Sequence, residues 1–258
     1  MEPEVSELDV ERYLARIGLD RAPSVDVEGL ETLQRAHLTA VPFENLDVFA
    51  QRGVETSLGW SIPKIVQRGR GGWCFELNGA FSALLLALGF EVRRLGATVL
   101  LEPASPEASH LTLEVKLDSV YLVDVGFGDS FIRPLRFGVN EPQDAGSGQY
   151  LLVHHEAGDD NEWLLSQIEQ GDPRPKYRFG LTEWTLADFD AASQRLQTGT
   201  SLHWTQSRFA TRLLDGGPDR VTLLKDRIKI RRDGVTDERP VASSEWDDEL
   251  QRWFDLVP

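Results

Sequence analysis

The first 90 residues repeat apolar side chains at spacings of three and four, which is the pattern of helices with one buried face. Four helices are predicted in this stretch. The first begins after an N-cap at Asp9 and ends at Gly18, and the third begins at Ser61-Ile-Pro, where a proline suits the first helical turn. The second helix is predicted from the spacing of Leu30, Leu33 and His37, and it stops before Val41-Pro42. The fourth is predicted from an apolar stripe that ends at Gly89 and consists of Leu77, Phe81, Leu84, Leu85 and Leu88.

Beyond Gly89 the apolar positions alternate with polar ones, which is the period of a β-strand. Stretches rich in turn-forming residues separate the alternating segments. We therefore predict an antiparallel sheet or barrel over residues 91–185. Its predicted strands cover residues 93–101, 111–117, 121–127, 149–155 and 163–167.

The last third of the chain has a weaker pattern. Apolar residues at helical spacing predict short helices at 186–195 and 207–214. Two alternating segments at 221–224 and 227–231 predict a strand pair. The chain closes with a predicted acidic helix at 243–256.

Composition and charge narrow the class of protein. The chain has 258 residues, 41% of them hydrophobic, which is enough for one large core or two to three small ones. Its formal net charge of −15 opposes binding to nucleic acid or to an anionic membrane surface. No apolar stretch reaches the ~20 residues of a membrane-spanning helix, and the acidic N-terminus lacks the basic and apolar regions of a signal peptide. One cysteine provides neither an internal disulfide nor a thiolate zinc site, so we expect a cytoplasmic protein that needs no metal.

That single cysteine, Cys74, lies where two glycines lead into the last of the four predicted helices, in Arg70-Gly-Gly-Trp-Cys-Phe-Glu-Leu-Asn78. The unpaired N–H groups and the positive dipole end of a helix start favour a thiolate and can bind an oxyanion. Glycines allow a tight turn and the close approach of an acyl group. The pattern therefore favours a nucleophilic cysteine over a small buried hydrophobe, which a free cysteine otherwise often is.

A nucleophilic thiol needs a base, and His110 is the best placed of the five histidines. It opens a predicted strand, and Asp124 follows in the next one. Of the other four, one lies on an apolar helix face, two are consecutive in a strand, and one lies in a loop rich in Ser and Thr. These are His37, His154, His155 and His203.

Whether His110 and Asp124 share a face depends on the loop between their strands. A two-residue turn at Asp118-Ser119 puts His110 opposite Phe127 and turns the His110 and Asp124 side chains to opposite faces. A three-residue loop over 116–118, or a five-residue loop over 115–119, sets His110 directly across from Asp124, with Cβ atoms ~4.5–5.5 Å apart. The spacing leaves this choice open.

Four blocks follow one another along the first half of the chain: Val41-Pro-Phe-Glu-Asn-Leu46, the cysteine block, His110-Leu-Thr-Leu113 and Val123-Asp-Val-Gly-Phe-Gly128. With these blocks in this order, the chain resembles the arylamine N-acetyltransferase family. The resemblance implies an α+β fold with a helical bundle, a central antiparallel β-barrel and a C-terminal α/β lid. Combined with the patterns above, it places the bundle and its cysteine in 1–90, the barrel with the histidine and aspartate in 91–185, and the lid in 186–258.

The resemblance also implies a two-step reaction. Acetyl-CoA acylates the cysteine, CoA leaves, and an arylamine or arylhydrazine takes the acetyl group. Position by position, Cys74 is then the nucleophile, His110 the base that protonates the leaving group, and Asp124 the carboxylate that orients the imidazole. The three side chains are expected to be arranged as in papain-like proteases.

Other positions of the blocks carry further implications. Phe43 and Phe127 match family positions that line the acceptor pocket, where an aromatic ring can stack. Asn78 matches a position that hydrogen-bonds near the aspartate. Arg70 and Glu76 also belong to the motif, and we expect them to act first as ion-pair or capping residues. Because CoA is polyanionic and the chain is acidic, we expect the helix start at Cys74 and Arg68 or Arg70 to supply local attraction.

The C-terminal third departs from the family pattern. Family members carry a Ser-Thr-Ser-Pro-type segment before a phenylalanine, whereas residues 198–209 here contain no proline. This part of the family fold shapes the substrate cleft, so a second hypothesis is an amide synthase that moves a polyketide acyl chain from a carrier thioester to an aromatic amine. A papain-like thiol peptidase, a transglutaminase-like enzyme and an inert scaffold are further alternatives. The acceptor, the natural donor and the oligomeric state are not predicted.

Overall fold

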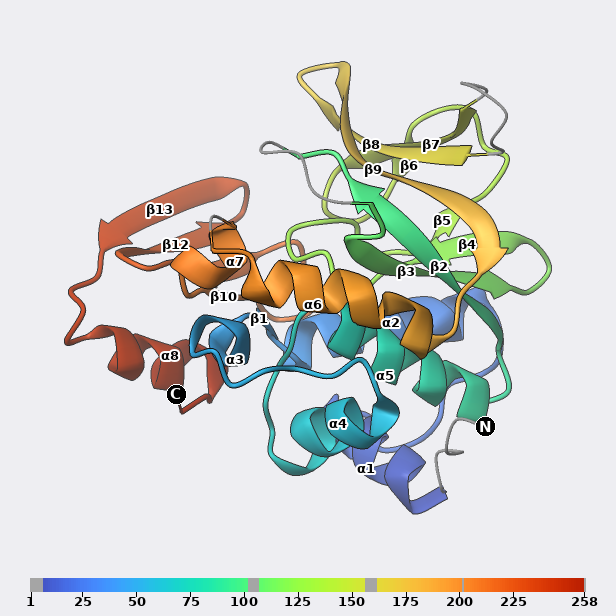
Figure 1. Cartoon of the computed structure of the whole chain (residues 1–258). Helices are drawn as coiled ribbons and strands as arrows, with labels where there is room; N and C mark the ends of the chain where they lie inside the picture. Colours follow the sequence, from blue (N-terminus) through green and yellow to red (C-terminus); the bar gives the residue numbers. More distant parts are fainter. Residues whose placement is uncertain (1–6, 102–106, 156–161, 201, 258) are drawn as a thin grey trace.

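The computed structural model describes residues 7–101, 107–155, 162–200 and 202–257. Figure 1 shows the helices of the first 90 residues at the bottom, a large sheet at the top and a smaller sheet at the left. Helix α6 (Asp190–Thr198) passes between the two sheets in this view. The combination of helices with a curved antiparallel sheet confirms the predicted α+β class.

Helix α5 (Cys74–Ala87) lies at the centre of the molecule. It packs against α1 and α4 on one side and against β2 and β3 on the other. Every side chain from Cys74 to Leu85 is buried, so this helix is covered all round and not along one stripe only. No helix in the described part of the chain is long and apolar enough to cross a bilayer. The helices of this region are α1 (Glu7–Arg16), α2 (Val27–Ala40), α3 (Leu46–Phe49), α4 (Leu58–Ile62), the π-helix η1 (Pro63–Gln67) and α5.

Two predicted helix starts are wrong. Helix α1 begins at Glu7, so Asp9 lies inside the helix and is not its N-cap. Helix α4 begins at Leu58, ahead of Ser61, and Pro63 opens the π-helix instead of an α-helix. A proline cannot donate the backbone hydrogen bond that would continue α4, and the chain instead widens into a turn in which the Arg68 N–H bonds to the Pro63 carbonyl, five residues back.

The large sheet is antiparallel throughout and nearly closes into a barrel. Its strand order is β5-β4-β3-β2-β9-β8-β7-β6. The two edge strands, β5 and β6, meet through Gln143, whose side-chain amide bonds to the N–H and the carbonyl of Arg136 at 2.9 Å each. The strands are β2 (Glu91–Val99), β3 (His110–Lys116), β4 (Val120–Val123), β5 (Leu135–Arg136), β6 (Gln143–Asp144), β7 (Gln149–His155), β8 (Glu162–Glu169) and β9 (Asp172–Glu183).

Strand β9 is the central strand that was not predicted individually. Pro173 and Pro175 interrupt its N-terminal half, and proline demotes a strand prediction because it has no N–H for the ladder. Its later residues nevertheless pair with both β2 and β8, and Tyr177 and Phe179 enter the core of the barrel. The barrel therefore depends on a segment whose sequence pattern is weak.

The smaller sheet joins a strand of the helical region to four strands of the last third of the chain. Its order is β1-β10-β11-β12-β13, and β1 comes from the first 90 residues. Residues 207–214, predicted as a helix, instead contain strand β10, because pairing with β1 and β11 on both sides overrides local helical spacing. The predicted strand pair and the final helix are confirmed as β11, β12 and α8. The elements are β1 (Phe43–Glu44), the 3-10 helix η2 (Leu186–Phe189), α7 (His203–Gln206), β10 (Ala210–Leu213), β11 (Arg220–Leu223), β12 (Arg227–Arg232), β13 (Val235–Pro240) and α8 (Trp246–Phe254).

The division into 1–90, 91–185 and 186–258 stays a prediction about the organisation of the chain. The β1–β10 pairing crosses it, since Phe43 lies opposite Thr211. One hydrophobic cluster also extends from Tyr13 on α1 to Leu213 on β10.

His37 is a packing residue of this core, as its place on an apolar helix face predicts. It is fully buried, its Nε2 lies 3.0 Å from the Tyr13 hydroxyl, and its ring packs against Phe81. Burial, aided by the charge of Arg16, lowers the pKa of His37 to about 3. The folded protein therefore holds a neutral imidazole at pH values where the unfolded chain would already bind a proton.

This difference predicts a loss of stability in acid. Below pH ~6.5 His37 is protonated in the unfolded chain, whereas in the folded protein it stays neutral down to about pH 3. The free energy of unfolding therefore falls by ~1.4 kcal/mol for each pH unit in that window. We expect the His37→Gln variant to lose ~2 kcal/mol less than the wild type between pH 7 and pH 5. Urea unfolding at the two pH values measures both losses. Equal losses in the two proteins would contradict the prediction, whatever the variant's stability at pH 7.

Candidate active site

Cys74 is the first residue of α5, and a tightly packed loop holds it there. A Cβ on Gly71 would lie 2.1 Å from the Pro42 carbonyl oxygen, and one on Gly72 would lie 2.7 Å from Oε2 of Glu76. The two glycines thus allow the chain to approach itself closely in this turn. Glu44 donates its N–H to the Gly72 carbonyl at 2.9 Å, which ties this loop to β1.

Three segments meet at the sulfur. The Cys74 side chain is 7% exposed, and its Sγ bonds to the carbonyl of Ser109, the residue before β3, at 3.8 Å. The loop after β4 passes just as closely, because a Cβ on Gly126 would lie 2.8 Å from the Cα of Cys74. The helix start, the start of β3 and the loop after β4 therefore surround the thiol.

The structure brings His110 and Asp124 together beside Cys74. Nε2 of His110 lies 2.6 Å from Oδ2 of Asp124, and both side chains are buried. Oδ1 of Asp124 accepts hydrogen bonds from the Asn78 amide at 2.8 Å and from the Gly126 N–H at 2.9 Å. Asn78 thus lies where the resemblance implies, one turn along α5 from the cysteine. Hydrogen bonds from α5 and from the loop after β4 therefore hold the Asp124 carboxylate in position against the imidazole.

The register between β3 and β4 is neither of the two considered for the sequence. Leu113 pairs with Val123 and Val115 with Tyr121, around a three-residue loop over 117–119. Continued past Val123, this register would set Asp124 across from Thr112, so Asp124 is one diagonal step away from His110. The observed register preserves the parity that puts both side chains on one face, and diagonal neighbours lie within reach of such side chains.

The electrostatics favour a charged pair. Burial opposes charge on His110, but the Asp124 carboxylate and the Cys74 side chain outweigh it and raise the pKa of His110 to about 10. Burial likewise opposes ionisation of Asp124, and the His110 imidazole together with the Asn78 and Gly126 donors keeps its pKa below the usual value. A protonated imidazole between a carboxylate and a thiol is the arrangement that stabilises a thiolate.

Phe127 belongs to the loop after β4, and Phe43 of β1 packs against the same loop. Phe127 is half-buried, and its ring meets the His110 ring edge-on with centroids 5.1 Å apart. Phe43 packs against Phe209 at 5.5 Å. Gly128, with φ +87°, keeps this loop close to Phe43, since a Cβ there would lie 3.3 Å from Cδ1 of that ring. Both aromatic rings therefore belong to the surroundings of the thiol.

Tyr177 is the site residue that the sequence did not indicate. Its hydroxyl donates to Oδ2 of Asp124 at 3.0 Å and lies 3.2 Å from the Thr112 hydroxyl, while its ring packs against His110 and Phe127. It reaches the site from β9, the strand with the weak pattern. No spacing within the sequence connects it to the other residues, because only the pairing of β9 with β2 in the curved sheet brings it to the site.

The remaining sequence candidates lie elsewhere. Arg70 pairs with Glu44 at 2.9 Å and Glu76 bonds to the N–H of Trp73, which confirms their ion-pair and capping roles. His154 is exposed and packs on Trp163. The side chains of His155 and His203 are outside the described residues. Among the residues that the structure describes, no three His, Cys, Asp or Glu side chains are grouped so as to hold a metal ion.

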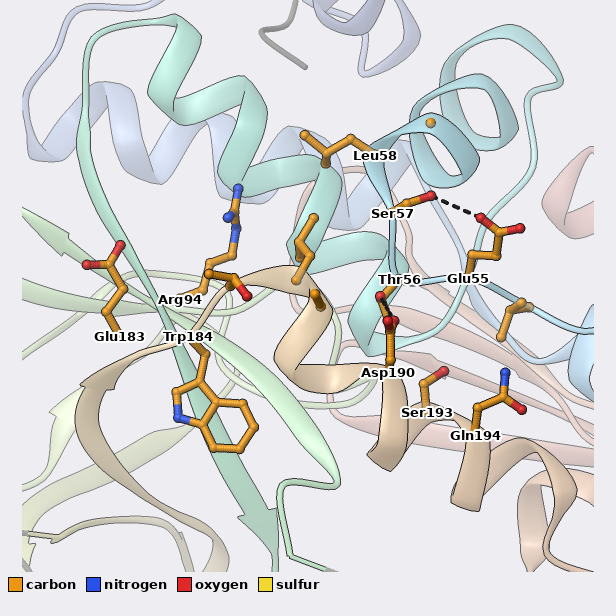
Figure 2. Close-up of a pocket in the computed structure, with 15 residues that line it drawn as sticks. Glu55, Thr56, Ser57, Leu58, Arg94, Glu183, Trp184, Asp190, Ser193 and Gln194 are labelled. Atoms are coloured by element: carbon orange, nitrogen blue, oxygen red, sulfur yellow. Dashed lines mark hydrogen bonds between the residues drawn. The ribbon is translucent and has the colours of Figure 1, made fainter. Parts of the chain in front are cut away.

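A separate cleft of about 1240 Å³ opens beside residues 54–59 and 183–194. Figure 2 shows Arg94 and Glu183 at one side of it and Asp190, Ser193 and Gln194 at the other, where the Thr56 hydroxyl donates to the Asp190 carboxylate. Its lining includes none of Cys74, His110 and Asp124. The cleft and the candidate active site are therefore distinct features.

Comparisons with known proteins agree with the geometry of the site. A family model described as N-acetyltransferase matches residues 26–257. The chain is 36% identical over 215 residues to the arylamine N-acetyltransferase of Escherichia coli (strain K12). The matched region covers 80% of this chain and 73% of that protein. It is 33% identical over 239 residues to the enzyme of that name from Mycolicibacterium smegmatis, with 89% and 85% covered.

Solved structures show the same likeness over the whole fold. The arylamine N-acetyltransferase from Salmonella typhimurium superimposes with a TM-score of 0.89 at 30% identity, covering 96% of this chain and 91% of that one. The Mycobacterium marinum arylamine N-acetyltransferase in complex with CoA gives 0.86 at 28% identity, covering 95% and 92%. By sequence and by structure, the chain belongs to the arylamine N-acetyltransferase family.

Proposed function

We propose that this protein transfers an acetyl group from acetyl-CoA, through a thioester on Cys74, to the nitrogen of an arylamine or arylhydrazine. The observation that carries the proposal is the contact of the thiol with an imidazole that Asp124 holds at 2.6 Å, at the start of a buried helix. Family membership supports the donor and acceptor classes. The N–H groups in the first turn of a helix have no partner within the helix, so the start of α5 can donate to the oxyanion that forms during acyl transfer.

The first half-reaction uses the charged pair. The Cys74 thiolate attacks the carbonyl carbon of acetyl-CoA and forms a carbon–sulfur bond. The tetrahedral adduct collapses, the bond to the CoA sulfur breaks, and the His110 imidazolium gives its proton to that sulfur. CoA leaves as the thiol, and the enzyme keeps an acetyl thioester and a neutral imidazole.

The second half-reaction reverses the proton flow. The amine nitrogen attacks the thioester carbon while neutral His110 takes the amine proton. Breaking the carbon–sulfur bond then releases the amide and restores the thiolate and the imidazolium. Asp124 fixes the tautomer of His110 and stabilises its cation in both steps, and Asn78 holds Asp124 in place.

The acceptor pocket in this proposal lies beside Phe43 and Phe127. Phe127 in the loop 124–128 contacts His110, and Phe43 packs against Gly128 of the same loop, which supports a place for a flat amine beside these rings. For the polyanionic donor, Arg70 is already paired with Glu44, which leaves the helix start and Arg68 as the local sources of attraction. A thiolate nucleophile that must stay reduced fits the cytoplasm, which we keep as part of the proposal.

The relatives reported above are named for arylamine N-acetylation, which favours acetyl transfer over the amide synthase and thiol peptidase hypotheses. Intact-mass analysis after exposure to acetyl-CoA tests the choice. We expect the gain of one acetyl group on the wild type and none on Cys74→Ala, and we expect an added arylamine to remove the acetyl group. Absence of an acetyl adduct would contradict the proposal. An adduct formed only with a longer acyl thioester would instead support the amide synthase.

A further inference from the structure

A buried ion cluster lies directly behind the start of α5. Nζ of Lys64, on the π-helix, is 2.8 Å from Oδ2 of Asp47 and 2.8 Å from Oε1 of Glu76. The Lys64 side chain is 2% exposed and that of Glu76 is 1% exposed. Arg70 extends the cluster to Glu44 at 2.9 Å. Side chains this deeply buried need partners for every charge, since removing one partner leaves an uncompensated ion.

Glu76 connects this cluster to the cysteine. Its Oε2 accepts the N–H of Trp73, the residue immediately before Cys74, at 3.1 Å, and its Oε1 accepts the Trp60 indole N–H at 2.7 Å. The missing Cβ of Gly72 gives the carboxylate room to reach this position. The Glu76 carboxyl group is thereby held within the helical turn that carries the sulfur.

The charges of the cluster balance. Three cations (Lys64, Arg70 and Arg52) face three carboxylates (Glu44, Asp47 and Glu76). Burial opposes charge on Lys64, but the carboxylates outweigh it and raise the pKa of this ammonium above its ordinary value. Burial raises the pKa of Glu76, and Lys64 opposes that rise. Lys64 is therefore the group that favours the ionised form of the carboxyl beside Cys74 and supplies its counter-charge.

We propose that Lys64 is a positioning residue for the nucleophile, which acts through Glu76 to fix the start of α5 and to cancel the negative charge that would otherwise oppose the Cys74 thiolate. The inference rests on the proposed role of Cys74. The other titratable groups that face the sulfur are His110 from β3 and, through it, Asp124. His110 and Asp124 favour the thiolate form of Cys74. The net charge of the Glu76–Lys64 pair therefore decides whether the other side of the sulfur adds to this effect or opposes it.

Two substitutions break the same ion pair with opposite changes of charge. Lys64→Met leaves the cluster with an extra negative charge, and Glu76→Gln leaves it with an extra positive one, while the Gln oxygen can still accept the Trp73 N–H. The readout is the rate of Cys74 alkylation by iodoacetamide between pH 4 and pH 10, followed by intact mass. Cys74 is the one cysteine of the chain, so each adduct reports on it alone.

We expect Lys64→Met to raise the pH of half-maximal alkylation by about one unit and Glu76→Gln to lower it by about as much. The double variant, which removes both charges, is expected to stay within ~0.3 units of the wild type and covers the case in which Lys64→Met fails to fold. Lys116→Met, which removes an exposed lysine paired with Glu91, is the matched control. Shifts in the same direction for both single variants, no shift in either, or a displaced double variant would overturn the proposal and leave Lys64 a packing role.

Alkylation requires neither acetyl-CoA nor an amine. Failure of the acetyl-transfer proposal would therefore appear in the mass experiment with acetyl-CoA, while failure of the Lys64 proposal would appear only in these alkylation profiles.

Discussion

The Asp124→Asn variant is expected to transfer acetyl groups 10³- to 10⁴-fold more slowly than the wild type. Asparagine keeps the size of the side chain but removes the charge that raises the pKa of His110 to about 10. Without it, burial favours a neutral imidazole, the thiol loses the cation that stabilises its thiolate, and the amide can hold the ring in the wrong tautomer. The rate of CoA release with saturating arylamine measures the effect.

Asp118→Asn is the matched control for this variant. It makes the same substitution at an exposed position in the loop between β3 and β4, at the opposite end of β4 from Asp124. We expect it to keep the wild-type rate within about twofold, as surface substitutions have small effects. If Asp124→Asn released CoA at a rate within tenfold of this control, Asp124 would not orient or charge the imidazole, and the assigned triad would be incorrect.

The second large effect is expected from Gly126→Ala, which we predict to slow acetyl transfer about 100-fold. The added Cβ would lie 2.8 Å from the Cα of Cys74 and 2.8 Å from the Asn78 amide nitrogen. Neither neighbour can move freely, because one is helix backbone and the other holds Asp124. The loop must therefore shift, and a displacement of ~1 Å at reacting groups is enough for a loss of this size. Overpacking also costs about 1–3 kcal/mol of stability.

Gly180→Ala controls for the substitution itself. Gly180 lies in β9, and a Cβ there would meet no atom within 4 Å. Acetyl transfer and urea unfolding are measured for both variants, at a temperature where each is folded. A Gly126→Ala enzyme as fast as Gly180→Ala would show that the loop can retreat from Cys74 without disturbing the reaction.

The sequence was most informative where function depends on neighbours along the chain. Cys74 at a helix start, and helix ends before Val41 and before Gly89, follow from local pattern and are confirmed by the structure, in which α2 ends at Ala40 and α5 at Ala87. The proximity of His110 and Asp124 was left open, because a strand pattern fixes the faces of side chains only after the loop sets the register. The actual register differed from both candidates, yet it preserved the parity on which the contact depends.

Residues brought in from distant strands could not be predicted. Tyr177 reaches Asp124 only because β9 pairs with β2 in the middle of the curved sheet, and two prolines weaken the strand pattern of β9 in the sequence. β10 was read as a helix because its partner, β1, is a two-residue strand more than 160 positions earlier in the chain. The sequence likewise does not mark Lys64 as buried, since a lysine in a helical stretch is ordinarily solvated. In each case tertiary pairing, and not local preference, decides the structure.

The pairing of β1 with β10 has a consequence for biosynthesis. The loop before Cys74 bonds to β1, and β1 completes its sheet only when residues 210–213 are available. During synthesis on the ribosome, Cys74 therefore emerges long before β10, the strand that pairs with β1 and so stabilises the loop before the cysteine. Such late, long-range closure slows folding and leaves partly folded species exposed meanwhile. Products that terminate ahead of residue 210 are thus expected to possess the thiol without a finished site around it.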